Sequence, residues 1–172
     1  MYSICYYGNP VLRIKASEIP KEAIASFKTV AENMFETMYA YQGIGLAAQQ
    51  VGLTDSILVV DIHEPEWERV AMINPKITGT GTEEMCMEEG CLSFPDIRAD
   101  IVRPEKIEVR YYDLNGDCHE KKLDGLIARV LLHEIDHLNG VLFIDRMSPA
   151  KRFLIKNKLN KLRASHKDAG SQ

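Results

Sequence analysis

The sequence predicts a mixed helix-and-strand protein, on three observations. A helical pattern of apolar residues spaced three and four apart covers residues 21–41. Short β-branched segments then follow one another as far as residue 123, and Asn115-Gly116 is a strong hairpin turn between the last two. Two more helical patterns, over residues 124–140 and about 149–165, end the chain. Helices therefore flank a run of strands whose last pair is antiparallel.

The elements follow in order. Residues 9–20 contain two prolines and predict an irregular entry to the helix over 21–41, which ends at Gln42-Gly43. Residues 43–52 carry three glycines among small residues, which predicts a close backbone approach. Taken alone, this run is best explained as a helix cap followed by tight packing. Strands or extended segments are predicted over residues 57–61, 70–78, 88–95, 101–102, 106–112 and 119–123.

The bulk composition indicates one soluble globular domain over residues 1–172. No run approaches the roughly 20 apolar residues of a membrane span, and the N-terminal residues lack the pattern of a signal peptide. The four cysteines have no disulfide-framework spacing, so they are expected to be reduced thiols: Cys5, Cys86, Cys91 and Cys118. We therefore expect a cytoplasmic protein with no membrane or DNA partner.

Charge is distributed unevenly along the chain, whose formal net charge is -4. Seven basic residues and no acidic residue lie between Lys151 and Lys167, so the rest of the chain is strongly acidic. A basic tail on an acidic body indicates either a solvated helix face or a polyanionic partner for the tail alone.

The helix predicted over residues 124–140 contains the run His133-Glu134-Ile135-Asp136-His137, which fits the pattern H-E-x-x-H. Residues four apart on a helix share one face, so His133 and His137 can hold one metal ion from the same side. The Glu134 carboxylate would then flank the ion as general base for a bound water. The structural alternative is a pair of core histidines beside a surface glutamate.

The same helix is predicted to be buried. Asp124 is a suitable N-cap and Gly140 a suitable residue just past the C-terminus. Apolar residues between them cover two neighbouring faces, and ionisable groups on a buried helix need a partner, for which a metal ion is the simplest choice.

A catalytic site of this kind usually has a third protein ligand and one open position. Metzincin proteases place a histidine six residues after the second histidine, where this chain has Phe143. Thermolysin-like proteases use a downstream glutamate, and no glutamate follows Glu134. Asp145 stays open as a ligand, but Cys91, which follows a glycine in an extended segment, is the better candidate.

Three stretches together resemble the signature motifs of the peptide deformylase family, in order and at family spacing. They are Gly43-Ile44-Gly45-Leu46-Ala47-Ala48-Gln49-Gln50, Glu89-Gly90-Cys91-Leu92-Ser93 and His133-Glu134-Ile135-Asp136-His137. The resemblance implies an α+β fold, with antiparallel β-sheets wrapped around a central metal-binding helix, plus an N-terminal and a C-terminal helix. It also implies removal of the N-terminal formyl group from the formylmethionine of new polypeptides, with release of formate. The N-formylmethionyl nascent peptide is then the main partner.

The resemblance assigns a role to each matching residue. Metal binding falls to Cys91, His133 and His137, with water in the fourth place. The ion is expected to be Fe²⁺, with Zn²⁺, Ni²⁺ or Co²⁺ able to replace it. Glu134 becomes the general base and then the acid, while the Gln50 side chain and the Leu92 backbone N–H stabilise the oxyanion. The substrate backbone pairs with Ile44, Gly45 and Gly90, and the methionine pocket is lined by Leu126, Arg129 and Val130.

Three finer expectations and two rival functions complete the predictions. The Arg129 stem lines the pocket while its charged head reaches water. Asp136 faces away from the metal and pairs with a strand arginine such as Arg103. The basic C-terminal helix either remains solvated or docks on ribosomal RNA. The rival functions are a zincin-type metallopeptidase, with Asp145 or Asp168 as third ligand, and a zinc-stabilised domain without catalysis.

Overall fold

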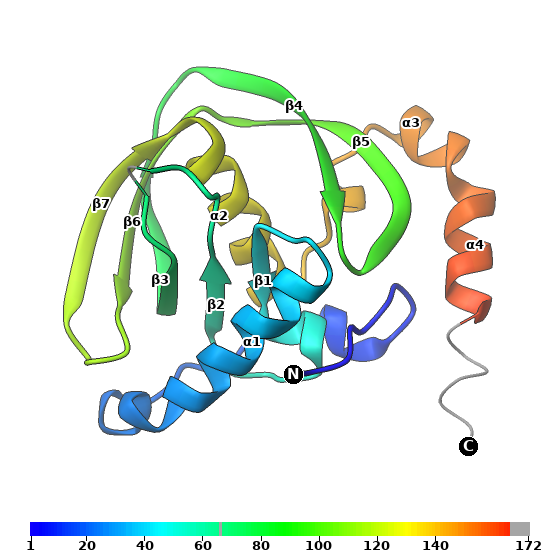
Figure 1. The fold of residues 1–172 in the computed structure, drawn as a ribbon. Coiled ribbons are helices and arrows are strands. Elements are labelled where there is room, and N and C mark those ends of the chain that lie inside the picture. The colour runs from blue at the N-terminus through cyan, green and yellow to red at the C-terminus, as the bar shows by residue number, and fades with distance from the viewer. Residues whose placement is uncertain (66, 166–172) are drawn as a thin grey trace.

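The computed structural model describes residues 1–65 and 67–165, and its architecture is the predicted α+β fold (Figure 1). The described residues contain no helix of the length and apolarity that crossing a bilayer requires. Lys167, the last residue of the basic stretch, lies outside the described residues, as does Asp168.

Five strands form one antiparallel sheet in the spatial order β1-β2-β3-β6-β7. The hairpin predicted at Asn115-Gly116 joins the last two, and Tyr112 pairs with Cys118 across its base. The strands are β1 (Gly45–Ala47), β2 (Ile57–Val60), β3 (Val70–Thr80), β6 (Lys106–Tyr112) and β7 (Cys118–Asp124).

A separate two-stranded antiparallel sheet consists of β4 (Glu84–Cys91) and β5 (Phe94–Pro104). It is longer than the extended segments expected at residues 88–95 and 101–102. Alternate residues of β4 turn one face toward the protein interior, and that face ends in Glu89 and Cys91. The register between the two strands shifts at Gly90/Cys91.

The central helix α2 (Gly125–Leu138) lies within the curve of the strands, as Figure 1 shows. Its residues are buried almost continuously from Ile127 to Leu138, which confirms the buried helix expected from the apolar pattern. Asp124 occupies the N-cap position without a side-chain hydrogen bond. Gly140 follows the helix with φ of +71°, and a Cβ there would lie 2.6 Å from the Arg13 carbonyl oxygen, so only glycine fits.

The N-terminal helix differs from its prediction in its first part. Residues Lys21–Phe27 form a 3-10 helix, and the α-helix α1 covers Lys28–Ala40. After it, the expected helix cap and tight packing are present: Gln42 has a φ of +57°, and the Gly43 N–H donates to the Met38 carbonyl oxygen at 2.8 Å. The buried residues that follow form the strand Gly45–Ala47 and the short 3-10 helix Ala48–Val51, which the sequence did not predict. The strand brings Gly45 against Glu134 and Val130 of α2. The close backbone approach was therefore predicted correctly, but the sequence did not indicate that a strand makes it.

The C-terminal segment is two helices, α3 (Pro149–Leu154) and α4 (Lys156–Ser165), with Ile155 between them. The apolar spacing over residues 149–165 predicts that Phe153 and Leu154 pack inward with Leu159, and this is wrong, because their exposed fractions are 72% and 81%. Leu159 does pack, into a small second core around Phe94 and Phe143. The larger core lies between α1, α2 and the five-stranded sheet.

Candidate metal centre and active site

One described cluster of side chains could hold a metal ion, and it consists of Cys91, His133 and His137. One ligand atom from each lies within 4.8 Å of the others, and Cys91 Sγ is 3.2 Å from His137 Nε2. A tetrahedral ion with bonds of roughly 2.0–2.3 Å needs donors roughly 3–4 Å apart. Strand β4 therefore brings a thiol to the two imidazoles that α2 presents one turn apart.

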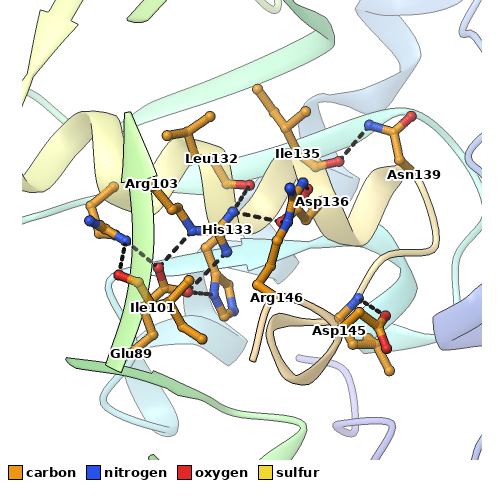
Figure 2. A network of polar contacts seen from close by, with 12 residues as sticks. Glu89, Ile101, Arg103, Leu132, His133, Ile135, Asp136, Asn139, Asp145 and Arg146 are labelled. Carbon is orange, nitrogen blue, oxygen red and sulfur yellow. Dashed lines mark hydrogen bonds and ion pairs between the residues drawn. The ribbon is translucent and has the colours of Figure 1, made fainter. Parts of the chain in front are cut away.

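The His133 ring is oriented by Glu89, which sequence reasoning had quoted in a motif without giving it a role. Glu89 and Cys91 are two residues apart and share one face of β4. Glu89 contacts the Nδ1 side of the His133 ring, while Cys91 belongs to the donor cluster. His133 Nδ1 lies 2.9 Å from Glu89 Oε2, which leaves Nε2 for the cluster (Figure 2).

Charges on both histidines are set by burial and by these contacts. Burial lowers the pKa of His133, but hydrogen bonds with Cys91 and Glu89 outweigh it and raise that pKa well above its ordinary value. Burial lowers the pKa of His137 well below its ordinary value, which keeps this imidazole neutral. Metal binding at this cluster therefore competes with a proton on His133.

A buried arginine connects β5 to the metal helix. Arg103 donates from Nε to Glu89 Oε1 at 2.7 Å and from Nη1 to Asp136 Oδ2 at 2.6 Å (Figure 2). The predicted Asp136–Arg103 pair is confirmed. Arg146, which the sequence did not indicate, adds two more hydrogen bonds to Asp136, at 3.0 and 2.6 Å. Burial raises the pKa of Glu89, yet the hydrogen bonds from His133 and Arg103 dominate and hold it well below its ordinary value.

Glu134 is a buried carboxyl that lines the same hollow as Cys91 and His133. Burial raises the pKa of Glu134 to about 7. Its Oε2 atom is buried and has no hydrogen-bond partner among the described residues. A Cβ on Gly45 would lie 2.6 Å from Glu134 Oε1 and 2.7 Å from Val130 Cγ1, so the glycine lets β1 approach the helix beside this carboxylate.

Gln50 is held so that its amide nitrogen faces the cluster. Its Oε1 accepts a hydrogen bond from the Ala47 backbone N–H at 2.8 Å, and its Nε2 lies 3.5 Å from Cys91 Sγ. The side chain is buried, with an exposed fraction of 1%. A hollow of about 600 Å³ opens beside this group. Every site residue predicted from the sequence lines the hollow except His137, which is buried behind it.

Arg129 does not behave as expected. Its head is buried rather than solvated, and Nη1 donates to Glu89 Oε1 at 2.9 Å. The expectation failed because an arginine on a helix face normally extends to water, whereas here β4 and β5 cover it with three acceptor oxygens.

Asp145, the alternative third ligand, is engaged elsewhere. Its carboxylate pairs with the Arg13 guanidinium and accepts from the Leu142 backbone N–H at 2.9 Å. It belongs to no group of potential metal ligands among the described residues, while Asp168 lies outside them. The zincin arrangement therefore has no described third ligand.

The donor set fits a divalent ion of borderline softness. Thiolate and imidazole ligands suit zinc and the late first-row metals. Three protein ligands leave room for water or substrate, and the unpaired Glu134 Oε2 is an acceptor for whatever binds there. An α+β fold with three such donors, a buried carboxylate beside them and an open hollow defines the class of metal-dependent hydrolases.

Comparison with known proteins identifies the family within this class. The model of the Polypeptide deformylase family matches residues 1–153. A peptide deformylase of Thermotoga petrophila is 49% identical over 159 residues, covering 92% of this chain and 94% of the relative. The crystal structure of a Plasmodium falciparum peptide deformylase superposes with a TM-score of 0.90 at 37% identity, covering 99% of this chain and 100% of the other. A Synechococcus elongatus peptide deformylase in complex with actinonin gives 0.83 at 38% identity, covering 96% and 87%.

The chain belongs to the polypeptide deformylase family. It is an enzyme, and the family implies that a divalent metal ion serves its reaction.

Proposed function

We propose that this chain hydrolyses the N-terminal formamide of N-formylmethionyl nascent peptides and releases formate. The observation that carries the proposal is the buried, unpaired Glu134 Oε2 beside the Cys91, His133 and His137 cluster. A carboxyl whose pKa is about 7 can both accept and return a proton near neutral pH. Family membership supports the substrate class, and we infer that residues 1–172 form one catalytic domain that works in the cytoplasm.

The metal would be held by Cys91, His133 and His137, and we expect Fe²⁺, with Zn²⁺, Ni²⁺ or Co²⁺ as substitutes. When bound, such an ion acts as a Lewis acid that lowers the pKa of water and polarises a carbonyl. Glu89 would keep the His133 ring turned for this task, because its hydrogen bond to Nδ1 fixes the tautomer.

Glu134 would take the proton of the attacking water and later protonate the leaving amine. The Gln50 amide and the Leu92 backbone N–H would donate to the oxyanion, a kind of contact worth about 10²–10³ in rate. Gln50 suits this role because its oxygen is held by Ala47, which leaves the nitrogen facing the cluster.

The peptide would enter as an added strand along the backbone of Ile44, Gly45 and Gly90. These residues lie on the two sides of the hollow, from β1 and its preceding turn and from β4. The methionine side chain would contact Leu126, Val130 and the aliphatic stem of Arg129, which line the same hollow.

Formate release is the experiment that tests this function. The protein, purified without oxygen and loaded in turn with Fe²⁺, Zn²⁺, Ni²⁺ or Co²⁺, is offered a formylmethionyl tripeptide and an internally cleavable peptide blocked at both ends. Formate release with an intact blocked peptide supports the proposal. Cleavage of the blocked peptide without formate would establish the zincin alternative instead.

The basic C-terminal helices support a second proposal, docking on ribosomal RNA near emerging chains. Lys151 and Arg152 lie in the last turn of α3, which ends with the exposed Phe153 and Leu154. Helix α4 begins beyond the residues that the family model matches. Phosphate contacts of this kind weaken steeply with salt. Cosedimentation with ribosomes should fall when Lys158 and Lys161 are both replaced by glutamate. Unchanged binding by that variant would reject the proposal, and replacing Lys121 and Lys122 on β7 is the matched control.

A further inference from the structure

The Arg129 head occupies a cluster of three buried acceptors. Its Nη1 lies 2.9 Å from Glu89 Oε1 and 2.9 Å from the Ile101 carbonyl oxygen, while Nη2 donates to the Met85 carbonyl oxygen. The Arg129 side chain is only 6% exposed and the Glu89 side chain 4%. One negative and two neutral oxygens therefore converge on a single buried cation.

The Glu89 carboxylate has no hydrogen-bonding capacity left. Its Oε1 accepts from Arg103 Nε at 2.7 Å and from Arg129 Nη1 at 2.9 Å. Its Oε2 accepts from Arg103 Nη2 at 3.0 Å and contacts His133 Nδ1 at 2.9 Å. Four contacts fill the roughly four acceptor positions of a carboxylate. Two of these contacts tie Glu89 to Arg103 of β5, and a third orients the His133 ring. The fourth contact comes from Arg129.

The same groups line the hollow that receives substrate. Glu89 and Arg129 lie in its wall together with Leu126 and Val130. Without the guanidinium, this wall would present a carboxylate and two carbonyl oxygens. An ammonium group has three N–H donors, so this cluster would suit a lysine-like side chain. A buried Glu89 carboxylate that lacks its contact with Arg129 is also costly in free energy, so a cation that enters the hollow is stabilised there.

We propose that Arg129 is a specificity-determining residue, whose head fills this cation-binding cluster and so reserves the hollow for an uncharged first side chain. The inference rests on the proposed deformylase function and deepens it. A hollow with a carboxylate in its wall remains selective for apolar side chains because Arg129 takes the contact of that carboxylate that Arg103 and His133 leave open.

Two peptides that differ in one group test the inference. Formyl-norleucine and formyl-lysine tripeptides share a four-carbon side chain, and lysine adds only the ammonium. The ratio of their kcat/KM values is measured for the wild type and for Arg129→Ala. We expect a preference for norleucine of about 100-fold or more in the wild type and a fall of at least about tenfold in the variant, chiefly through the KM of the lysine peptide.

Chemical rescue gives a second readout. Ethylguanidinium resembles the missing head, so its addition to Arg129→Ala should restore the preference for norleucine and raise the Tm of the variant. Ethanol at the same concentration should do neither. Arg129→Lys keeps a cation at this place and should retain the wild-type ratio.

A matched control separates this local effect from a general loss of positive charge. Arg98 lies at the exposed rim of the same hollow and pairs with Glu88 at 3.5 Å, with a side chain 71% exposed. Arg98→Ala should leave the norleucine-to-lysine ratio within about twofold, since exposed charges are screened.

Where the alanine variant is not recovered folded, Arg129→Gln, which keeps a donor but no charge, takes its place in the same assay. An unchanged ratio in either folded variant overturns the inference while leaving the deformylase function intact. A wild-type protein that releases no formate from either peptide or from a formylmethionyl peptide overturns both.

Discussion

Replacement of Gly45 by alanine should lower turnover by about 100-fold in a protein that still folds. The added Cβ would lie 2.6 Å from Glu134 Oε1 and 2.7 Å from Val130 Cγ1, whereas ordinary contacts begin at 3.4 Å. The strand or the carboxylate must therefore move by about 0.8 Å. Overpacking of this size costs ~1–3 kcal/mol of folding free energy. A displacement near 1 Å at the reacting groups lowers the rate by about 100-fold.

Three measurements on Gly45→Ala check this reasoning. The free energy of unfolding comes from urea titration, the metal content from elemental analysis, and kcat/KM from formate release. The metal content should not change, because the added carbon meets the base and not the three ligands. Gly81→Ala is the control, since its Cβ would meet only the Lys106 side chain closely, at 3.3 Å. Turnover of Gly45→Ala within threefold of the wild type would refute the tight placement of Glu134.

Three further predictions concern the general base, the Asp136 clamp and the Asp145 ion pair. Glu134→Ala should keep its metal and lose about 10²–10⁴-fold in turnover, and near wild-type formate release would remove Glu134 as the base. Asp136→Ala leaves Arg103 and Arg146 without their shared carboxylate, so urea titration should show that the free energy of unfolding falls by ~3–5 kcal/mol. A fall below ~1 kcal/mol would argue against a stabilising role for this carboxylate. Burial raises the pKa of Asp145, but the Arg13 contact outweighs burial and lowers that pKa. The ionised carboxylate therefore contributes its full stabilisation at pH values above 3.8, the pKa of the unfolded state. That stability should disappear as the pH falls through the lowered pKa, and the unfolding free energies of wild type and Asp145→Asn should converge there; a constant difference across the acid range would contradict the pairing.

The ligand cluster was accessible from the sequence because its members follow simple periodicities. Two histidines four apart on a helix define one face. Position 143 is phenylalanine rather than histidine and no glutamate follows Glu134, so the third ligand was sought upstream, at Cys91. The Asp136–Arg103 pair was also predictable, since a helix residue facing away from the metal toward strands needs a buried cation.

The two-stranded sheet was largely missed because its outer face is charged. Glu84 and Glu88 in β4, and Asp100 in β5, alternate with inward residues, so no continuous apolar run marks either strand. A period-two signal was nevertheless present in β5, where Ile97, Ala99, Ile101 and Arg103 turn inward. Following that alternation would have placed Arg103 on the buried face.

The role of Glu89 and the burial of Arg129 were beyond local pattern reasoning. Each depends on which groups a distant segment brings nearby: the Glu89 carboxylate meets donors from positions 103, 129 and 133. A sequence window contains only one side of such contacts. The usual preference of arginine for water predicted the wrong position for its head, and only the strands covering it reverse that preference.

X-ray absorption at the metal edge of the zinc-loaded protein tests the three-ligand centre most directly. We predict one sulfur at about 2.3 Å and two imidazole nitrogens at about 2.0–2.1 Å, with one lighter atom completing the shell. A first shell without sulfur, or one unchanged by Cys91→Ala, would contradict the centre formed by Cys91, His133 and His137.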